Sequence, residues 1–271
     1  MNVDLHTHTT ASDGSLSPAQ LVDAACAAGV QLLSITDHDT MDAYSQLGPQ
    51  SSLQIVPGVE FSSRWQRMGV HVVGLNLEPE CARVREAVRA QGDARAARAE
   101  AIVHALRELE IPDLLEAARA CAGGGVPGRP HFATVLVQHG KVRDTKHAFK
   151  RYLGAGKPGD VLVAWKELEC VVGWIREAGG IAVLAHPGKY GLTRAKLRRL
   201  CAAFCDAGGQ AMEVISGPQD PALTSWLGEM STRRGLLASV GSDFHRPDQS
   251  WGRLGNCPPL PEGCRPVWEA F

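Results

Sequence analysis

Short apolar runs that end in a histidine or a carboxylate recur along this chain of 271 residues. In the first, at residues 2–8, apolar and polar side chains alternate, so an extended backbone turns His6 and His8 to the same face. Five further runs end in the same way: at 36–39, Glu60, His71, His186 and 241–245. A single ending of this kind is commonly a buried histidine or a turn aspartate. Their recurrence predicts one shared site.

The order of the predicted elements indicates an α/β protein. Strands are predicted at 2–8, 31–36, 53–60, 69–75, 181–185, 211–215 and 237–240. Helices are predicted at 17–28, 165–178, 193–206 and 221–234, the first with Ser17 as N-cap and Pro18 in its first turn. Seven strands with helices between them favour a mostly parallel sheet covered by helices. The candidate ligands lie at the carboxyl ends of their strands, which share one face in a parallel barrel, so we expect them to meet there.

The character of the chain changes over residues 80–170, which we call the helical insertion. Residues 80–110 are rich in Ala, Arg and Glu and predict a long solvated helix, and a second helical piece is predicted at 113–122. Residues 129–157 then carry seven Lys or Arg and one acid. A solvated basic face is the usual explanation, and a lid that gathers an anionic substrate is the alternative. We therefore expect one domain from 1–79 and 171–271, with 80–170 as an inserted substrate lid.

Composition narrows the class of protein. A hydrophobic content of 44% and a charged content of 21% are typical of a soluble globular protein. The net charge of -1 gives no overall drive toward nucleic acid or an anionic membrane, and we expect neither duplex DNA nor a membrane as a partner. The eight cysteines are scattered without a Cys-x-x-Cys pair, which favours reduced thiols. With no secretory signal and no apolar run near the roughly 20 residues of a membrane span, we expect a cytoplasmic protein.

As an ordered set, the motifs resemble those of the PHP (polymerase and histidinol phosphatase) family of metal-dependent phosphoesterases. The set comprises His6-x-His8, Asp13, Thr36-Asp37-His38, Gly58-Val59-Glu60, His71, His186-Pro187-Gly188 and Gly241-Ser242-Asp243-Phe244-His245. The resemblance covers nearly the whole chain outside the helical insertion. It implies a distorted seven-stranded (β/α)7 barrel that holds two or three divalent metal ions.

The resemblance also implies which residues hold each metal. The first metal would take His6, His8, Glu60 and Asp243. The second would share Glu60 and take His71 and His186. The third would use Asp13, His38 and His245, with Asp13 standing where some family members have a histidine. The extra carboxylate favours harder ions.

The residue types themselves indicate the metals and the chemistry. Mixed imidazole and carboxylate ligands suit Mn²⁺, which we expect, or Zn²⁺, Fe²⁺ or Co²⁺. Such ions lower the pKa of a bound water, so hydroxide forms at neutral pH. We expect a metal-bridging hydroxide to attack phosphorus, with Glu60, Asp13, His38 and Asp243 as the catalytic residues that hold it. Asp4, Asp37 and Asp39 are candidates for orienting the ligands.

The helical insertion, with its Gly128-Arg129-Pro130-His131 motif, is similar to that of one subgroup of the family. This subgroup includes 3′,5′-nucleoside-bisphosphate phosphatases and 5′→3′ exonucleases of short oligoribonucleotides. The resemblance implies hydrolysis of the 3′-phosphate of substrates such as pAp, and it leaves trimming of short single-stranded RNA open. The alternatives are a histidinol-phosphate phosphatase and a metal-binding module without catalysis. A basic insertion fits a polyanionic substrate better than histidinol phosphate.

Four residues are candidates for contacting the substrate, and each has a plainer explanation. Arg129 would grip phosphate in a bidentate fork, or it is a surface residue. His131 would assist it, or it is a polar group at a helix N-terminus. Ser216 would touch substrate, or it belongs to a plain turn. Lys189 would contact phosphate, or it is a surface lysine.

Overall fold

Two sheets organise the computed structural model, which describes residues 1–48, 53–162, 165–248 and 252–271. The first sheet is parallel and has the order β1 (Val3–Asp4), β2 (Leu32–Leu33), β3 (Gln54–Ile55). The second has the order β4 (Gly58–Trp65), β5 (Met68–Leu75), β6 (Ile181–Leu184), β7 (Ala211–Ser216), β8 (Leu237–Gly241). The alternation of strands and helices confirms a mixed α/β fold.

The strand expected at 53–60 is divided in the structure. Pro57 lies between β3 and β4 and has no N–H to donate to a ladder, so β3 pairs with β2 while β4 pairs with β5. β4 then continues to Trp65 and turns through Gln66, whose φ is 56°, into the antiparallel strand β5. β5 also pairs antiparallel with β6, whereas β6, β7 and β8 are parallel. The described residues thus form eight strands rather than the expected seven.

Backbone hydrogen bonds join the two sheets at two places. On one side the Leu5 N–H donates to Val240 O at 3.0 Å, and the Asp243 N–H donates to His6 O at 2.9 Å. On the other side, His38 and Glu60 form a parallel bridge, where the Asp39 N–H donates to Glu60 O at 3.0 Å. These bonds bring the chain after β1, β2 and β8 next to the start of β4.

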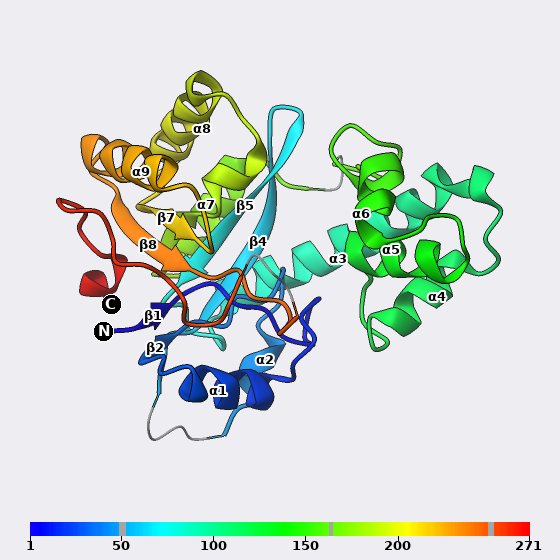
Figure 1. Ribbon diagram of the computed structural model, residues 1–271, viewed down its shortest axis with the longest axis horizontal. Helices are drawn as coiled ribbons and strands as arrows, with labels where there is room; N and C mark the ends of the chain where they lie inside the picture. The colour runs from blue at the N-terminus through cyan, green and yellow to red at the C-terminus, as the bar shows by residue number, and fades with distance from the viewer. Residues whose placement is uncertain (49–52, 163–164, 249–251) are drawn as a thin grey trace.

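Helices cover the outer faces of both sheets (Figure 1). They are α1 (Pro18–Ala27), α2 (Asp42–Ser45), α7 (Leu168–Glu177), α8 (Arg194–Asp206) and α9 (Pro221–Arg233). As expected, α1 begins at Pro18, and Ser17 accepts a hydrogen bond from the Gln20 N–H in a capping box. Short 3-10 turns are η3 (Pro187–Tyr190) and η4 (Val267–Ala270). No helix among the described residues is both long and apolar enough to cross a membrane.

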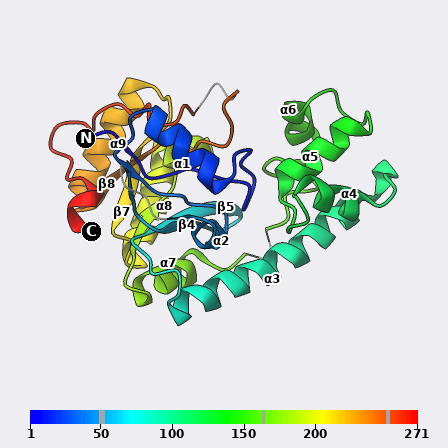
Figure 2. The same cartoon turned by 90° about the horizontal axis from the view of Figure 1, so that it is seen from below.

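The helical insertion stands beside the sheets and is joined to them by the long helix α3 (Figure 2). It contains α3 (Ala82–Ala105), η1 (Arg107–Leu109), α4 (Leu114–Cys121), α5 (Arg129–Gln138), α6 (Thr145–Ala148) and the π-helical turn η2 (Phe149–Leu153). It has a hydrophobic cluster separate from that of the sheets, with Ile102, Phe132 and Leu136 fully buried. The long helix and the second helical piece lie where the sequence predicts them.

Candidate metal centre

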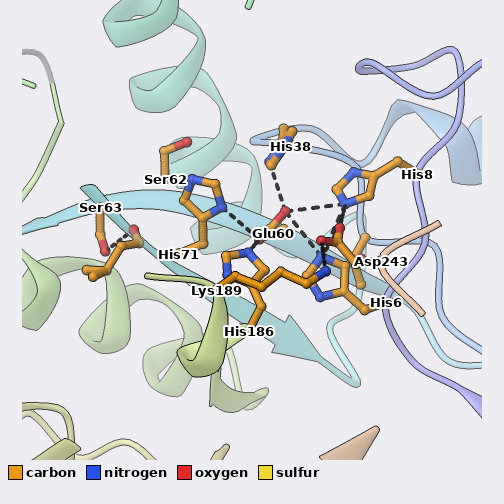
Figure 3. Close-up of polar contacts among 12 residues, drawn as sticks. His6, His8, His38, Glu60, Ser62, Ser63, His71, His186, Lys189 and Asp243 are labelled. Carbon is orange, nitrogen blue, oxygen red and sulfur yellow. Dashed lines mark hydrogen bonds and ion pairs between the residues drawn. The ribbon is translucent and has the colours of Figure 1, made fainter. Parts of the chain in front are cut away.

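Nine histidines and carboxylates meet where the two sheets join. His6 and His8 follow β1, Asp13 lies in the next turn and His38 follows β2. The others come from the second sheet: Glu60, His71, His186, Asp243 and His245. Each belongs to at least one set whose ligand atoms all lie within 4.8 Å of one another. Figure 3 shows His6, His8, His38, His71 and His186 around the carboxylate of Glu60. The nine residues predicted as metal ligands are thus brought together.

Two of the nine do not lie at the carboxyl ends of strands, and that expectation was wrong for them. Glu60 is the third residue of β4 and His71 is the fourth residue of β5. Because the strands are antiparallel, with Glu60 opposite Val73 and Ser62 opposite His71, the two side chains are diagonal neighbours on one face. A hairpin register, rather than parallel strand ends, places this pair.

Glu60 lies at the middle of the cluster and is fully buried. Its Oε1 is 2.8 Å from His71 Nδ1 and 2.8 Å from His186 Nε2. Its Oε2 is 3.2 Å from His6 Nε2 and 2.9 Å from His38 Nδ1. The two oxygens therefore face different pairs of histidines, which is the geometry that a carboxylate shared by two metal ions needs.

The other two carboxylates extend the cluster on either side of His8. Asp243 Oδ1 lies 3.4 Å from His8 Nε2 and 3.6 Å from His6 Nε2. Asp13 Oδ1 lies 3.3 Å from His245 Nε2, and its Oδ2 lies 3.8 Å from His38 Nε2. Four overlapping sets of nitrogen and oxygen atoms result, each with one carboxylate.

The unpartnered atoms in this cluster fit divalent metal ions. Among the described residues, Glu60 Oε2 and the Nδ1 atoms of His8 and His38 are buried without a well-directed hydrogen bond, although Oε2 and His38 Nδ1 lie 2.9 Å apart. Burying such a group unsatisfied costs about 1–3 kcal/mol, so several together need a compensating partner. A cation bound to their lone pairs supplies one, and imidazole with carboxylate is a donor set for first-row transition metals.

The electrostatics of the metal-free cluster follow from its burial and mixed charge. Desolvation would raise the pKa of Glu60, but His71, His6 and His38 hold this pKa well below its usual range. Burial and the neighbouring His245 lower the pKa of His8 to about 3, so its imidazole is neutral at pH 7. Burial opposes protonation of His245 as well, yet Asp13 raises the His245 pKa to about 9. A metal that takes His245 must therefore displace a proton.

Comparisons with known proteins agree with this centre. Residues 4–121 match the PHP domain. The chain is 41% identical to the 5′-3′ exoribonuclease Rnm of Escherichia coli (strain K12), over 99% of this chain and 93% of that protein. The chain belongs to the PHP family. It is 38% identical to the 3′,5′-nucleoside bisphosphate phosphatase of Chromobacterium violaceum, over 98% of this chain and 95% of that protein.

A solved structure is similar over the whole chain. It is described as an amidohydrolase from Chromobacterium violaceum with bound sulfate and no metal. Its TM-score is 0.88 at 37% sequence identity, and the match covers 100% of this chain and 95% of that one. The similarity includes the helical insertion as well as the sheets of this PHP protein.

A carboxylate that the sequence analysis missed lies behind the ligands of this PHP protein. Glu213 on β7 is 1% exposed, and its Oε1 is 2.5 Å from His6 Nδ1. Its Oε2 accepts hydrogen bonds from the His186 N–H at 2.5 Å and from Ser216 Oγ at 2.8 Å. Glu213 is the one charged residue in the apolar run 211–215, and that signal could have identified it. Ser216, a predicted substrate contact, is buried against Glu213 and does not line the cavity beside the centre.

Three aspartates hold the backbone around the ligands, as expected of orienting groups. Asp4 accepts from the Ser242 N–H at 2.8 Å, next to Asp243. Asp37 accepts from the Thr9 N–H at 2.7 Å, next to His8. Asp39 accepts from Arg95 Nε at 2.6 Å on α3, and so ties the helical insertion to the site. A carboxylate that fixes a neighbouring loop in this way limits the motion of the ligand it adjoins.

A cavity of about 410 Å³ opens beside the metal centre. His71, His186 and Asp243 line it from the sheets, and Arg129 lines it from the helical insertion. Arg129 Nη1 donates to Asp160 Oδ1 at 3.2 Å, which fixes one edge of the guanidinium. These contacts place a fixed positive charge opposite the metal centre.

Of the remaining predicted substrate contacts, Lys189 lines the cavity and His131 does not. Lys189 Nζ lies 2.6 Å from Asp243 Oδ2. His131 Nδ1 accepts from the Gly128 N–H at 2.9 Å at the N-terminus of α5. Burial lowers the pKa of His131, which favours the neutral imidazole that this bond requires. His131 therefore has a structural partner, and its contact with substrate stays a prediction.

Proposed function

We propose that this PHP protein hydrolyses the 3′-phosphate of nucleoside 3′,5′-bisphosphates such as pAp and trims short oligoribonucleotides 5′→3′. The observation that carries the proposal is a cavity beside the nine candidate metal ligands, three of which line it together with Arg129 and Lys189. Relatives of about 40% identity, named for each of the two activities, match almost the whole chain and support it. Both reactions break a phosphate ester bond, so one centre suffices for the two.

The proposed centre holds two or three ions, with Mn²⁺ preferred. His6, His8, Glu60 and Asp243 would hold the first. Glu60, His71 and His186 would hold the second, and Asp13, His38 and His245 the third. When bound, such ions make a nucleophilic hydroxide available at neutral pH and offset the charge that builds on the phosphoryl oxygens.

The protein's own groups would position the substrate. The free edge of the Arg129 guanidinium matches phosphate oxygens, and Lys189 adds a second positive charge near Asp243. The aromatic rings of Phe149 and Trp165 also line the cavity, and they offer surfaces on which a nucleobase can stack. These contacts favour a phosphorylated nucleotide over a phosphorylated amino alcohol.

We also propose a separate role for each of the two parts of the chain. Residues 1–79 and 171–271 would act as a distorted seven-stranded barrel, in which β3 and β4 count as one strand interrupted at Pro57. Residues 80–170 would act as the substrate lid. The two places where the sheets are joined and the separate hydrophobic cluster of the insertion support this division.

Phosphate release tests the proposal directly. Metal-stripped protein is reloaded with Mn²⁺ and given either pAp or histidinol phosphate, and inorganic phosphate is measured. We expect release from pAp and little from histidinol phosphate. A preference for histidinol phosphate would overturn the substrate assignment, and release from neither would identify a metal-binding module. A 5′-phosphorylated RNA of five nucleotides, followed by product length, tests the exonuclease activity.

A further inference from the structure

A strongly basic groove lies on the helical insertion, outside the metal centre and its cavity. Its volume is about 660 Å³, and its lining residues are Arg143, Lys146, His147, Lys150, Arg151 and Lys157. None of these lining residues is acidic. We call this feature the basic groove. None of its residues is a candidate metal ligand, and none lines the cavity.

The charge of the basic groove is concentrated and largely uncompensated. Residues 129–157 carry seven Lys or Arg and one acid in a chain whose net charge is -1. Arg143 is paired with Asp144 at 3.0 Å, whereas no ion pair to Lys146, Lys150 or Lys157 is found within the described residues. Lys146 lies in α6 and Lys150 in the π-helical turn η2 that follows it, and because both line the same groove their like charges repel. An arrangement that costs stability calls for a partner of opposite charge.

The basic groove and the cavity are the two sides of one segment. Within residues 149–157, Phe149 and Gly154 to Gly156 line the cavity, while Lys150, Arg151 and Lys157 line the basic groove. Both views place α6 on the side of the insertion that faces the sheets (Figures 1 and 2). A polymer that leaves the cavity across this segment therefore meets a row of positive charges.

We propose that the basic groove docks the phosphates of single-stranded RNA that lies 3′ of the nucleotide held in the cavity. The inference rests on the proposed function and deepens it, because the cavity and the basic groove share no lining residue and a strand longer than the nucleotide in the cavity can contact both. An anionic membrane fits less well, since the exposed large apolar residues of the described chain are Met1, Val126 and Phe271, none of them in the groove. The basic groove would therefore contribute to binding of an oligonucleotide but not to binding of a mononucleotide.

Binding by metal-free protein tests the groove without catalysis. A fluorescein-labelled, 5′-phosphorylated RNA of eight nucleotides is titrated with native protein and with the K146E/K150E variant, and anisotropy is followed from 50 to 300 mM salt. We expect K146E/K150E to bind the RNA at least about tenfold more weakly than native protein at 100 mM salt. The slope of log Kd against log salt should fall by about 1.4, since each phosphate contact to a single strand contributes about 0.7.

The matched control carries the same change of charge elsewhere. R89E/R199E alters two exposed arginines on α3 and α8, away from the groove, and should bind RNA as the native protein does. The K146Q/K150Q variant removes the two positive charges without reversing them. Thermal melting of every variant shows whether weaker RNA binding comes from the loss of charge or from a loss of the folded state. The pAp kcat/KM of K146E/K150E should stay within about twofold of native, while that for the RNA falls about tenfold.

Several results would overturn the proposal: native-like RNA binding by K146E/K150E, an equal loss in R89E/R199E, or equally tight binding of duplex DNA or phosphatidylserine vesicles. The proposed function fails separately, if native protein releases no phosphate from pAp and no nucleotide from RNA. In that case the anisotropy measurement still decides whether the groove binds a strand.

Discussion

At the scale of single residues, the position of Glu60 between two pairs of histidines sets what the centre can hold. Its two oxygens lie 2.8–3.2 Å from four imidazole nitrogens, which belong to all three of the proposed metal sites. Removing it would leave those imidazoles without the anion that balances bound cations. No other carboxylate among the described residues is shared in this way by four histidines.

We predict that Glu60→Ala loses both metal and turnover. The bound-metal content should fall by at least one ion per chain, and kcat/KM for pAp by more than about 100-fold, above the range for an outer ligand partner. Elemental analysis and phosphate release check this, with exposed Glu108→Ala as the control. Unchanged metal content and rate would show that the ligand assignment is wrong.

Glu213 contacts the candidate ligands His6 and His186, and we expect it to act through them rather than as a ligand. Because it accepts from His6 Nδ1–H, it directs His6 Nε2 toward the cluster. We predict that Glu213→Gln weakens Mn²⁺ binding about 10- to 100-fold, measured by calorimetric titration of metal-free protein. Ser216→Ala, which removes one hydrogen-bond donor to Glu213, should weaken Mn²⁺ binding less than Glu213→Gln does. Equal affinity in Glu213→Gln and native protein would contradict this positioning role.

Arg129 is predicted to affect substrate and not metal. Arg129→Ala should lower kcat/KM for pAp by about 10- to 100-fold, the effect of losing a charge-assisted bond of roughly 1.5–3 kcal/mol. Its metal content should stay normal, because Arg129 contacts Asp160 and not the ligands. Steady-state kinetics with metal analysis check both parts, and Arg119→Ala, at a partly exposed arginine paired with Glu116, is the control. A parallel loss of metal would move Arg129 into the metal centre.

At the scale of elements, α3 carries the helical insertion and is fastened to the strands by polar contacts. Asp39 Oδ2 lies 2.6 Å from Arg95 Nε, and Asp39 Oδ1 accepts from Gln91 Nε2 at 2.8 Å. The Ser62 N–H of β4 also donates to Asp39, at 2.6 Å. A buried carboxylate thus bonds a helix and a strand together beside the site, and fixes where the insertion stands.

Removing the charge of Arg95 should therefore destabilise the protein in a pH-dependent way. Burial alone would raise the pKa of Asp39, but Arg95 and Ser62 hold it below its usual value. Stability from this group is present above the unfolded pKa of about 3.9 and is lost as the pH falls below that value. We predict that Arg95→Met lowers the free energy of unfolding by about 1–3 kcal/mol at pH 7 and by less near pH 4. Urea unfolding at both pH values checks this, with Arg95→Lys as the milder control; a pH-independent loss would contradict it.

At the scale of the whole molecule, we expect metal uptake to be coupled to protonation. Asp13 holds the pKa of His245 at about 9, against the effect of burial, so this histidine is protonated at pH 7 in the metal-free protein. Only the neutral imidazole binds metal. Below pH 9, each metal that takes His245 must release a proton. Above pH 9 that competition ends.

We predict that Mn²⁺ affinity at the site of His245 rises about tenfold per pH unit between pH 7 and 9 and then levels off. Calorimetric titration in buffers of different ionisation enthalpy measures the protons released per metal. His104→Gln, far along α3, serves as a control that leaves the release unchanged. A pH-independent affinity with no proton release would contradict the coupling.

The sequence alone was enough for features that depend on neighbours along the chain. The start of α1 follows from Ser17 and Pro18, because capping involves residues within one turn. The α/β alternation and the long helix of the insertion follow from periodicity and composition. The nine candidate ligands could be named because their motifs occur in order, and each motif is local.

Only the tertiary structure decided which distant side chains meet. The hairpin register places Glu60 beside His71, and β7 brings Glu213 behind His6. The packing of the insertion places Arg129, but not His131, in the lining of the cavity. These contacts join residues far apart in sequence, and their geometry depends on strand pairing and on where Pro57 interrupts it. Pairing is fixed by burying the whole core at once, so no short stretch of sequence specifies it.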